Sequence, residues 1–559
     1  MRKQTKLVAV LSAAALLAIG ASMTSFAAKG WAEENGSWYY YDNNGDYVTN
    51  DWQKSGNNWF WLGDDGAMMT SALIEDGNSK YYVDANGAMV TNRWVAIEPG
   101  DDDYNEDAPN HYWYFFGANG KAYKQSADKL AIKTINGKKY GFDQEGKMVY
   151  GFVQEDGTKN TDSDPFLRAD YYFGSSDDGA MHTDWLQYTD GSDLTSTVNG
   201  TVRSYADQDS MWFYFKPSNG KMVKFDASKD TQKVGYKVET VRGQKYGFDE
   251  NGVMIYEWQD ASVSTVNKYF SSEDDGHLRK KTWVYAVPSE NIDPQDFNDD
   301  QERWFYADAT GKVYKEVLKT VNGKKYLFDD KGRMKSGLQL VKDGKYEDNA
   351  AIKDGDDVTV DKIKKYAGEA KVYFFSADEE KDGSMKTGKN IKVEMADGDT
   401  YTFGFDKAGK GYTGLVDKTK IYLNGLLLSA SSDYGYQLLY ADSTNAAGAP
   451  EAILDESNTK LDAVIGSENN KYDNYVISKS GSIVKEGRYV KDADDNYYAV
   501  SNAKAGSDGA TKGTIKFFSY NVDDAQKKAS DYARCGKIRE GEGATDGNGN
   551  YKSLSSDCK

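Results

Sequence analysis

Tryptophan and tyrosine recur at a fixed spacing near the start of this 559-residue chain. Trp38 and Trp59 lie 21 residues apart, and each stands two residues before another aromatic residue, Tyr40 or Trp61. The electron-rich face of an aromatic ring attracts cations, and its breadth also makes it good packing material. The spacing therefore indicates a repeated aromatic surface, which either packs in the core or contacts a ligand.

These aromatic residues belong to a repeated unit that we interpret as two short strands joined by a turn. Residues 43–45, 64–66 and 85–87 read Asn-Asn-Gly, Asp-Asp-Gly and Ala-Asn-Gly, which are turn sequences that tolerate positive φ. Aromatic and β-branched residues fill the flanks, as half-buried strands prefer. A lone hairpin is marginally stable, whereas stacked hairpins bury a continuous core. We predict an all-β fold, an elongated solenoid of stacked β-hairpin repeats with a degenerate β-rich C-terminal region.

The chain divides into four parts. We assign residues 1–28 to a signal peptide, 29–342 to hairpin repeats with inserted loops, 343–430 to degenerate repeats, and 431–559 to an uncharacterised β-rich and partly disordered tail. Between residues 93 and 337, compact units without tryptophan alternate with units that acidic, polar insertions lengthen. Such insertions occupy loops on one face of a solenoid, often a binding face, and the alternation suggests a duplicated block.

Side chains of a strand alternate between two faces, which separates core from ligand positions. One parity of the second strand is apolar in every unit and is predicted to be core: Tyr39, Tyr41, Phe60, Leu62, Tyr81, Val83, Tyr114, Phe116, Tyr140, Phe142, Tyr246, Phe248, Tyr326 and Phe328. The other parity changes from tryptophan, as at Trp113, to lysine, as at Lys80 and Lys139, so we expect ligand contacts there. Any single aromatic residue is still more often core, and several in succession favour a ligand surface.

The first residues have the three-part pattern of a secretory signal. Three basic side chains precede an apolar stretch over residues 7–20, and Ala27 and Ala28 offer a cleavage site. The apolar stretch is too short for the ~20 residues that a membrane-spanning helix needs. We expect a secreted protein that has no transmembrane segment after signal cleavage and that stays at the cell surface without a covalent anchor.

The net charge limits the possible partners of the protein, and the cysteine content limits its disulfides. Residues 1–28 hold three basic and no acidic side chains, so the remaining chain carries 66 Lys and Arg against 88 Asp and Glu, a net charge of −22. This charge repels phosphate backbones, and no nucleic acid is expected as a partner. Cys535 and Cys558 form a disulfide in one interpretation and are two free thiols in the other.

We expect no catalytic residue, cofactor or metal. His111, His182 and His277 all fall within the repeats, and no histidine lies near Cys535 to build a nucleophilic pair. A carboxylate pair among the many acidic residues remains the open alternative. The spacing of residues 546–557 is similar to that of a calcium loop, but Tyr551 stands where such a loop needs glycine, which favours a disordered tail.

Residues 30–45 read Gly-Trp, six residues, Trp-Tyr-Tyr-Tyr-Asp, two residues and Gly. This pattern resembles the cell-wall-binding, choline-binding-like repeat of Gram-positive surface proteins, which is related to glucan-binding repeats and to receptor-binding repeats of clostridial toxins. The resemblance implies cages built from a first-strand tryptophan, a second-strand aromatic residue and an aromatic residue of the next hairpin. The ligand-binding residues carried over to this chain are Trp31, Trp38, Tyr40, Trp52, Trp59, Trp61, Tyr82, Trp94 and Trp113.

The function that this resemblance implies is non-catalytic attachment to cell-wall teichoic acid, choline or polysaccharide on the bacterial surface. The alternative is an adhesin or toxin-like receptor binder that recognises host glycans or proteins, and a third possibility is a spacer. Leu73 and Lys80 replace the tryptophans of the third repeat, so regular choline sites along the whole chain are not expected.

Overall fold

The computed structural model describes residues 29–442 apart from 101–107, 127, 161–163, 199–200, 207, 231–234, 260–266, 347–356, 377–381, 418, 431 and 434, together with 452–453, 472–484, 489–491, 497–500 and 515–519. The predicted signal peptide, the calcium-loop-like segment and both cysteines lie outside these residues. The chain forms two compact units, residues 1–265 with 270–278, and residues 266–269 with 279–559, which we describe separately. No helix in the described ranges is long and apolar enough to cross a bilayer.

The described residues form a nearly all-β fold made of many small antiparallel sheets. In chain order, the strands up to residue 278 are β1 (Gly30–Glu34), β2 (Ser37–Tyr41), β3 (Asp51–Ser55), β4 (Asn58–Leu62), β5 (Ala72–Asp76), β6 (Ser79–Val83), β7 (Arg93–Ile97), β8 (Tyr112–Phe116), β9 (Ala131–Ile135), β10 (Lys138–Phe142), β11 (Gly151–Val153), β12 (Tyr171–Phe173), β13 (Asp184–Tyr188), β14 (Thr195–Val198), β15 (Thr201–Ser204), β16 (Met211–Phe215), β17 (Lys237–Val241), β18 (Gln244–Phe248), β19 (Glu257–Gln259) and β20 (Lys268–Phe270). The predicted hairpin repeats are thereby confirmed.

The later residues add two short helices and further strands. They are β21 (Thr282–Ala286), α1 (Pro294–Asn298), β22 (Arg303–Ala307), β23 (Val317–Val321), β24 (Lys324–Phe328), β25 (Met334–Lys335), β26 (Gly337–Lys342), β27 (Lys345–Tyr346), α2 (Val360–Lys365), β28 (Lys371–Phe375), β29 (Gly388–Glu394), β30 (Thr400–Phe405), β31 (Gly414–Val416), β32 (Lys420–Leu423), β33 (Leu426–Leu427), β34 (Tyr436–Asp442), β35 (Ala452–Ile453), β36 (Tyr472–Ser478), β37 (Tyr489–Lys491), β38 (Tyr497–Val500) and β39 (Ile515–Ser519). Strands β29–β33 form one sheet of order β29-β30-β33-β32-β31.

The turn that joins the two strands of a hairpin is not the one that the sequence indicated. Strands β1 and β2 pair in register from Gly30 opposite Tyr41 to Glu34 opposite Ser37, so residues 35 and 36 form the turn. Asn35 and Gly36 have φ of 53° and 86°, as a type I′ hairpin turn requires. The predicted turn at residues 43–45 instead follows the second strand and leads the chain to the next hairpin.

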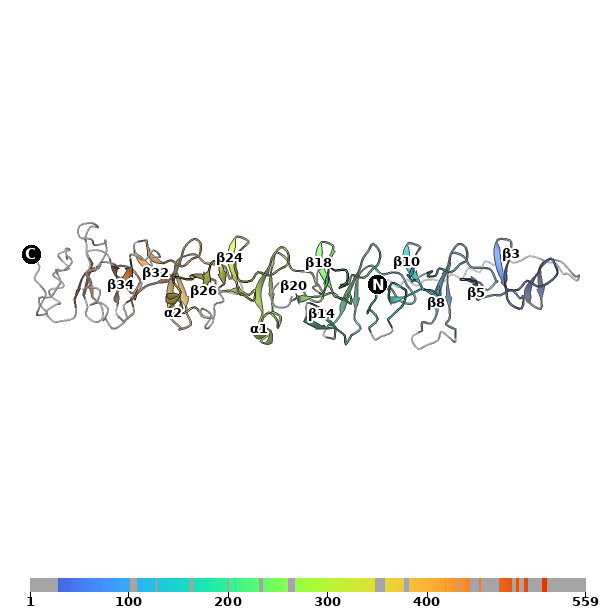
Figure 1. The fold of residues 1–559 in the computed structure, drawn as a ribbon, viewed down its shortest axis with the longest axis horizontal. Helices are drawn as coiled ribbons and strands as arrows, with labels where there is room; N and C mark the ends of the chain where they lie inside the picture. The colour runs from blue at the N-terminus through green and yellow to red at the C-terminus, as the bar shows by residue number, and fades with distance from the viewer. Residues whose placement is uncertain are drawn as a thin grey trace, which may run out of the picture. The chain divides into compact units, whose positions relative to one another are not determined.

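Each hairpin is hydrogen-bonded to the one before it. After the turn that follows β4, the backbone N–H of Met68 donates to the carbonyl of Trp38 in the preceding hairpin, at 2.7 Å. The same bond joins Met89 to Trp59 and Met148 to Trp113, both at 2.8 Å. Within each unit, the hairpins therefore follow one another in chain order and stack (Figure 1).

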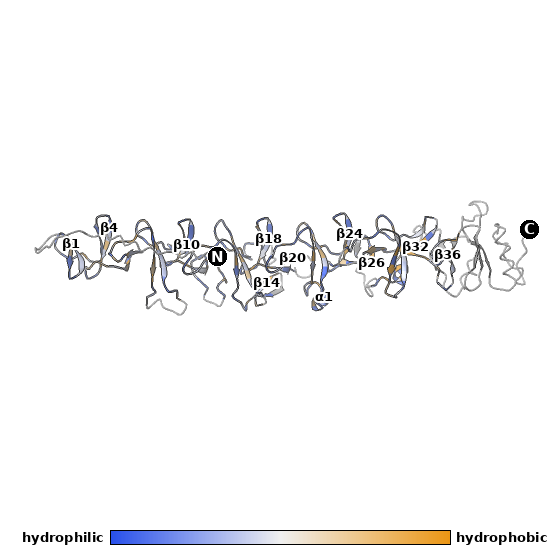
Figure 2. Ribbon diagram, turned by 180° about the vertical axis from the view of Figure 1, so that it is seen from behind, coloured by the Kyte–Doolittle hydropathy of each residue, from blue (hydrophilic) through white to orange (hydrophobic). Residues whose placement is uncertain are grey.

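The hairpins between residues 93 and 337 repeat in threes rather than by simple alternation. A wide hairpin (β7–β8, β13–β16 or β21–β22) precedes a compact one (β9–β10, β17–β18 or β23–β24). A further pair of strands then follows the compact hairpin, as β11–β12 and β26–β28 do. The tips of the compact hairpins are hydrophilic (Figure 2), whereas the second halves of β10, β18 and β24 are largely buried. The insertions of the second and third wide hairpins fold into β14–β15 and α1.

Packing within residues 337–430 is more globular than in the earlier hairpins. Helix α2 lies in the connection between β26 and β28, and Ile363, which is fully buried, packs in one cluster with Val372 and Phe403. The turn at residues 406–409 nevertheless repeats the earlier pattern, because the carboxylate of Asp406 accepts from two backbone N–H groups, at 2.8 and 2.9 Å.

Candidate functional site

Five groups of three aromatic residues recur along the hairpins, and we call them triads 1 to 5. Each combines a first-strand tryptophan, a second-strand tryptophan on the same hairpin face, and the central aromatic residue of the next hairpin's second strand. The triads are Trp31, Trp38 and Phe60; Trp52, Trp59 and Tyr81; Trp94, Trp113 and Tyr140; Trp185, Trp212 and Tyr246; and Trp283, Trp304 and Tyr326.

One contact is nearly constant in all five triads, and a second is nearly constant in three of them. The ring centroid of the first-strand tryptophan lies 5.3, 5.0, 4.9, 4.8 and 4.8 Å from the aromatic ring of the next hairpin in triads 1 to 5, always edge to face. In triads 3 to 5, the two tryptophans of the hairpin lie 6.3, 6.3 and 6.1 Å apart at 88°, 83° and 90°. In these three triads, the two indole rings are nearly perpendicular to each other, and the ring of the next hairpin lies below them.

The hairpin register and the bonds between hairpins position these rings. In triad 3, Trp94 pairs with Phe115 across the wide hairpin, which puts Trp113 on the same face two residues away. The carbonyl of Trp113 accepts the backbone N–H of Met148, at 2.8 Å, and so holds the compact hairpin that carries Tyr140. The residue that supplies the second ring therefore also positions the third ring.

The triads have a buried floor and a more open rim. Phe60, Tyr81, Tyr140 and Tyr326 are 4%, 9%, 7% and 9% exposed, whereas the tryptophans are half-buried, and Trp59 is 40% exposed. The indole Nε1 atoms of the first-strand Trp31 and of the second-strand Trp113 and Trp212 are buried and have no hydrogen-bond partner in the described part of the chain. Ring faces rather than polar groups therefore dominate these sites.

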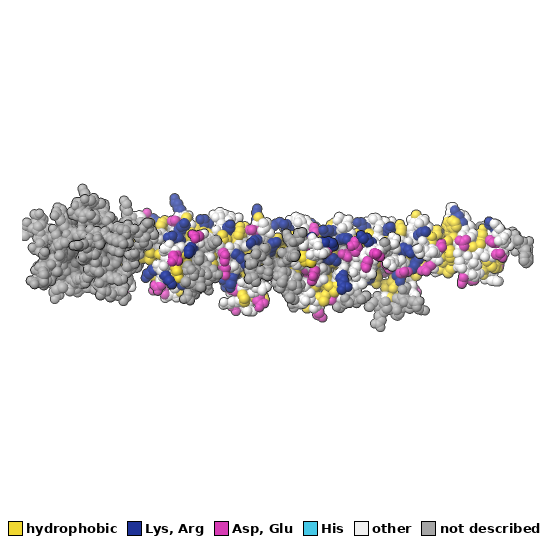
Figure 3. Space-filling view, viewed as in Figure 1, with side chains coloured by type: hydrophobic (Ala, Val, Ile, Leu, Met, Phe, Trp, Pro, Cys, Tyr) yellow, Lys and Arg dark blue, Asp and Glu magenta, His cyan; other side chains and the backbone are white. Residues whose placement is uncertain are grey.

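Charge around the triads is balanced. Burial raises the pKa of Tyr140 and of Tyr326, and nearby Asp178 and Asp382 raise it further, so both phenols stay neutral. A lysine of the same hairpin pairs with each of these aspartates, at 3.5 and 3.0 Å. Acidic and basic side chains are likewise interspersed over the face seen in Figure 3. The two aspartates beside triads 3 and 5 are therefore already paired with lysine.

Six of the nine predicted ligand residues belong to triads, and three do not. Tyr40 and Trp61 lie opposite the first-strand tryptophans of their own hairpins, with centroids 5.4 and 5.2 Å away. Trp61 is 8% exposed, so this half of the variable face is packed rather than open. Tyr82 packs on Phe116, at 6.1 Å. The six triad members are Trp31, Trp38, Trp52, Trp59, Trp94 and Trp113.

Several triad residues escaped the sequence prediction. The structure adds Trp185, Trp212, Trp283, Trp304, Phe60, Tyr81, Tyr140, Tyr246 and Tyr326. The last five are the core positions of the predicted parity, and their constant aromatic character hid their second role as the floor of a site. The signal that finds them is the order of hairpins, because a tryptophan-bearing hairpin precedes each one.

Other hairpins have aliphatic residues and lysine where triads have tryptophan. Leu73 and Lys80 occupy these places in β5–β6, and Leu318 and Lys325 do so in β23–β24. The ammonium of Lys80 contacts Glu145 at 2.6 Å and Glu75 at 3.3 Å. A triad therefore does not form at every hairpin, as the replaced residues of the third repeat indicated.

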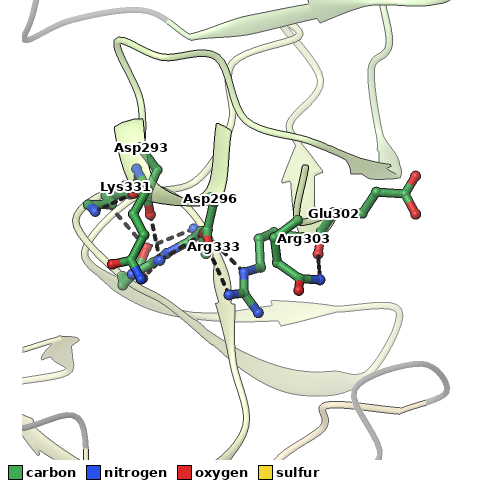
Figure 4. A network of polar contacts seen from close by, with 9 residues as sticks. Asp293, Asp296, Glu302, Arg303, Lys331 and Arg333 are labelled. Atoms are coloured by element: carbon green, nitrogen blue, oxygen red, sulfur yellow. Dashed lines mark hydrogen bonds and ion pairs between the residues drawn. The ribbon is translucent and has the colours of Figure 1, made fainter. Parts of the chain in front are cut away.

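A buried ionic network lies beside triad 5 (Figure 4). The side chains of Asp293, the cap of α1, and Asp296 are 2% and 7% exposed, and Nη1 of Arg333 contacts both carboxylates, at 2.6 and 3.0 Å. Arg303 donates two further hydrogen bonds to Asp296, at 3.0 and 2.8 Å. Because Arg303 directly precedes Trp304, the network fixes the α1 loop next to the triad.

Comparison with known proteins points to one repeat family. A family model described as a choline-binding repeat matches residues 48–94, and one described as a putative cell wall binding repeat matches residues 29–47 and 318–334. No curated protein matches the sequence.

Three solved structures from Streptococcus pneumoniae illustrate the structural similarity. They are the modular autolysin LytC (16% identity, 56% of this chain, TM-score 0.30), CbpJ from strain TIGR4 (15%, 69% of this chain, 0.32) and choline binding protein F (18%, 72% of this chain, 0.29). The match covers 54% of the LytC chain and 100% of the other two. On the evidence of the family models, residues 29–94 and 318–334 of this chain are repeats of the choline-binding, or cell-wall-binding, family.

Proposed function

We propose that this protein is a secreted, non-catalytic protein of the bacterial surface that attaches to choline-bearing or related cell-wall polymers through its aromatic triads. The observation that carries this proposal is the edge-to-face contact between a first-strand tryptophan and a ring of the next hairpin, which recurs in five places. In three of these places a second, nearly perpendicular tryptophan completes the same three-ring geometry.

The chemistry of a trimethylammonium group suits such a place. It is a cation without an N–H donor, so it needs ring faces and gains nothing from the hydrogen-bond acceptors that would select an ordinary ammonium ion. Each cation–π contact contributes ~0.5–2 kcal/mol, which makes a single site weak. Several weak sites on one chain bind a polymer with many cationic groups much more tightly, because later contacts are intramolecular.

The surroundings of the histidines support the non-catalytic part of the proposal. His277 lies near a serine and an aspartate, but Ser271 Oγ at 3.3 Å and Asp275 at 2.8 Å both contact the same ring nitrogen, Nδ1. A Ser-His-Asp relay needs the serine and the aspartate on opposite nitrogens. His182 Nε2 bonds to the carbonyl of Trp185, at 2.9 Å, which gives it a structural partner.

The test uses replacements that the chain itself contains. Compact hairpins have lysine where triads have the second-strand tryptophan, so Trp113→Lys, Trp212→Lys and Trp304→Lys are expected to preserve the hairpins. Calorimetric titration of the chain from residue 29 with choline should show saturable binding that this triple variant loses in large part. Equal binding by both proteins, or none by the wild type up to high millimolar choline, would overturn the proposal.

The second candidate is a receptor binder that recognises host glycans or proteins. Phe297 on α1 favours it, since its ring is 46% exposed on a loop that the ionic network holds in place. Binding of the soluble protein to host cells or glycan arrays that survives excess choline and disappears in Phe297→Ser would support this candidate.

A further inference from the structure

The five triads share three aromatic positions but differ at a fourth. This fourth position is the residue directly across the hairpin from the second-strand tryptophan. The pairs are Glu33 with Trp38, Lys54 with Trp59, Ala96 with Trp113, Gln187 with Trp212, and Tyr285 with Trp304. One position therefore holds an acid, a base, a small residue, an amide and an aromatic ring in turn.

The fourth position borders the site. Residues directly opposite each other in an antiparallel pair have Cβ atoms ~4.5–5.5 Å apart and point to the same face. This face is the one that carries both tryptophans of a triad. A ligand held between the rings consequently meets the fourth side chain as well, and this residue varies in charge and size from triad to triad.

Lys54 gives triad 2 a cation of its own. Its Nζ lies 5.8 Å from the ring centroid of Trp59, within the range of a cation–π contact. A ligand cation that approached the same ring would lose this contact and meet a like charge. Trp59 is the most exposed of the triad tryptophans, so Lys54 acts at an open ring face that a ligand would otherwise use.

Tyr285 has the opposite effect on triad 5. Its ring lies 4.6 Å from that of Trp304 at an angle of 35°, and it is 45% exposed. The tilted pair extends the aromatic wall outward beyond the three shared rings. Arg303, which precedes Trp304, is held by two hydrogen bonds to Asp296, so the wall has a fixed base.

We propose that the residue facing the second-strand tryptophan sets how well each triad accepts a cation, with Lys54 closing triad 2 and Tyr285 making triad 5 stronger than triads 3 and 4, whose fourth residues are also uncharged. The inference rests on the proposed function, because it ranks the sites by which the protein would bind choline. It predicts that the triads differ in their affinity for choline although they share the same three aromatic positions.

Single substitutions at the fourth position test this ranking in calorimetric titrations of the chain from residue 29 with choline. Lys54→Met should add one binding site, whereas Lys407→Met, which removes the same charge from an exposed turn, should add none. Tyr285→Gln, which copies the fourth residue of triad 4, should weaken one site about threefold to tenfold, the loss of one ring contact. In a Trp304→Lys background, Tyr285→Gln should change nothing further.

The outcomes separate this inference from the proposed function. If the wild type binds choline but Lys54→Met matches Lys407→Met in stoichiometry and Tyr285→Gln matches the wild type in affinity, the ranking is wrong and the proposed function stands. If the wild type binds no choline, the proposed function and the ranking fail together. A weaker site in Tyr285→Gln that persists in the Trp304→Lys background would assign Tyr285 to a place other than triad 5, which also overturns the ranking.

Discussion

The rings of Trp94 and Tyr140 meet edge to face with centroids 4.9 Å apart, although the two residues belong to consecutive hairpins. Trp283 and Tyr326 repeat this relationship at 4.8 Å. Each contact closes only when the second hairpin stacks on the first, so the proposed ligand site and the fold depend on the same pair of side chains. A substitution at either residue of such a pair should therefore affect stability as well as ligand binding.

Replacing the floor of triad 3 tests this dependence. Tyr140→Phe should leave both choline binding and stability nearly unchanged, because triad 1 has phenylalanine at the same place. Tyr140→Ala should lower the free energy of unfolding by ~3–5 kcal/mol, as truncation of a buried aromatic residue usually does. Urea titration followed by circular dichroism measures the difference. A Tyr140→Ala variant as stable as Tyr140→Phe would show that the ring is not part of the core.

Gly120 is a second place where hairpin stacking can be tested. Its φ is +78°, and a Cβ atom there would lie 2.5 Å from Sδ of Met89 in the preceding hairpin. Gly120→Ala should therefore destabilise the protein by ~1–2 kcal/mol, mainly from backbone strain, because the flexible Met89 side chain can move away from the added methyl group. Gly100→Ala is the matched control, because a Cβ atom at Gly100 meets nothing within 4 Å. Equal thermal midpoints for the two variants would contradict this packing.

The ionic network beside triad 5 should be costly to break from one side. Arg333→Met leaves Asp293 and Asp296 buried with fewer partners, and removal of one member of a buried pair typically costs ~3–5 kcal/mol. The exposed pair of Lys129 and Glu155, at 3.8 Å, offers the comparison, and Lys129→Met should cost at most ~1 kcal/mol. The urea midpoints of the two variants measure this difference in stability. Similar small losses in both variants would show that the network contributes little to the free energy of unfolding.

The same network predicts a loss of stability in acid. Hydrogen bonds from Arg303 and then Arg333 hold the pKa of Asp296 well below its usual range, although burial opposes them. Because the folded-state pKa lies below that of the unfolded chain, the contribution is complete above about pH 4 and is lost as the pH falls further. Urea midpoints measured from about pH 6 to pH 2.5 should fall more steeply for the wild type than for Asp296→Asn. Parallel curves would exclude Asp296 as the responsible group.

Much of the fold could be predicted from local sequence, with two errors that have physical reasons. The hairpin of residues 30–41 follows from its aromatic alternation, but its turn was placed at residues 43–45 because that Asn-Asn-Gly is as good a turn sequence as the Asn35-Gly36 that joins the strands. Alternation of two hairpin types was predicted instead of a period of three, because strands such as β11 and β12 are only three residues long. So short a strand leaves little pattern in the sequence.

The sequence by itself determined that the repeats are β-hairpins and which rings they carry, because both depend on residues that are neighbours along the chain. It identified Trp94 and Trp113 as ligand candidates and Tyr140 as core. Only the tertiary structure decided that these three rings form one site, since the third ring comes from another hairpin and insertions vary the distance to it along the chain. It also decided which residue borders each site, because Lys54 and Tyr285 reach their tryptophans across a hairpin register that spacing alone does not reveal.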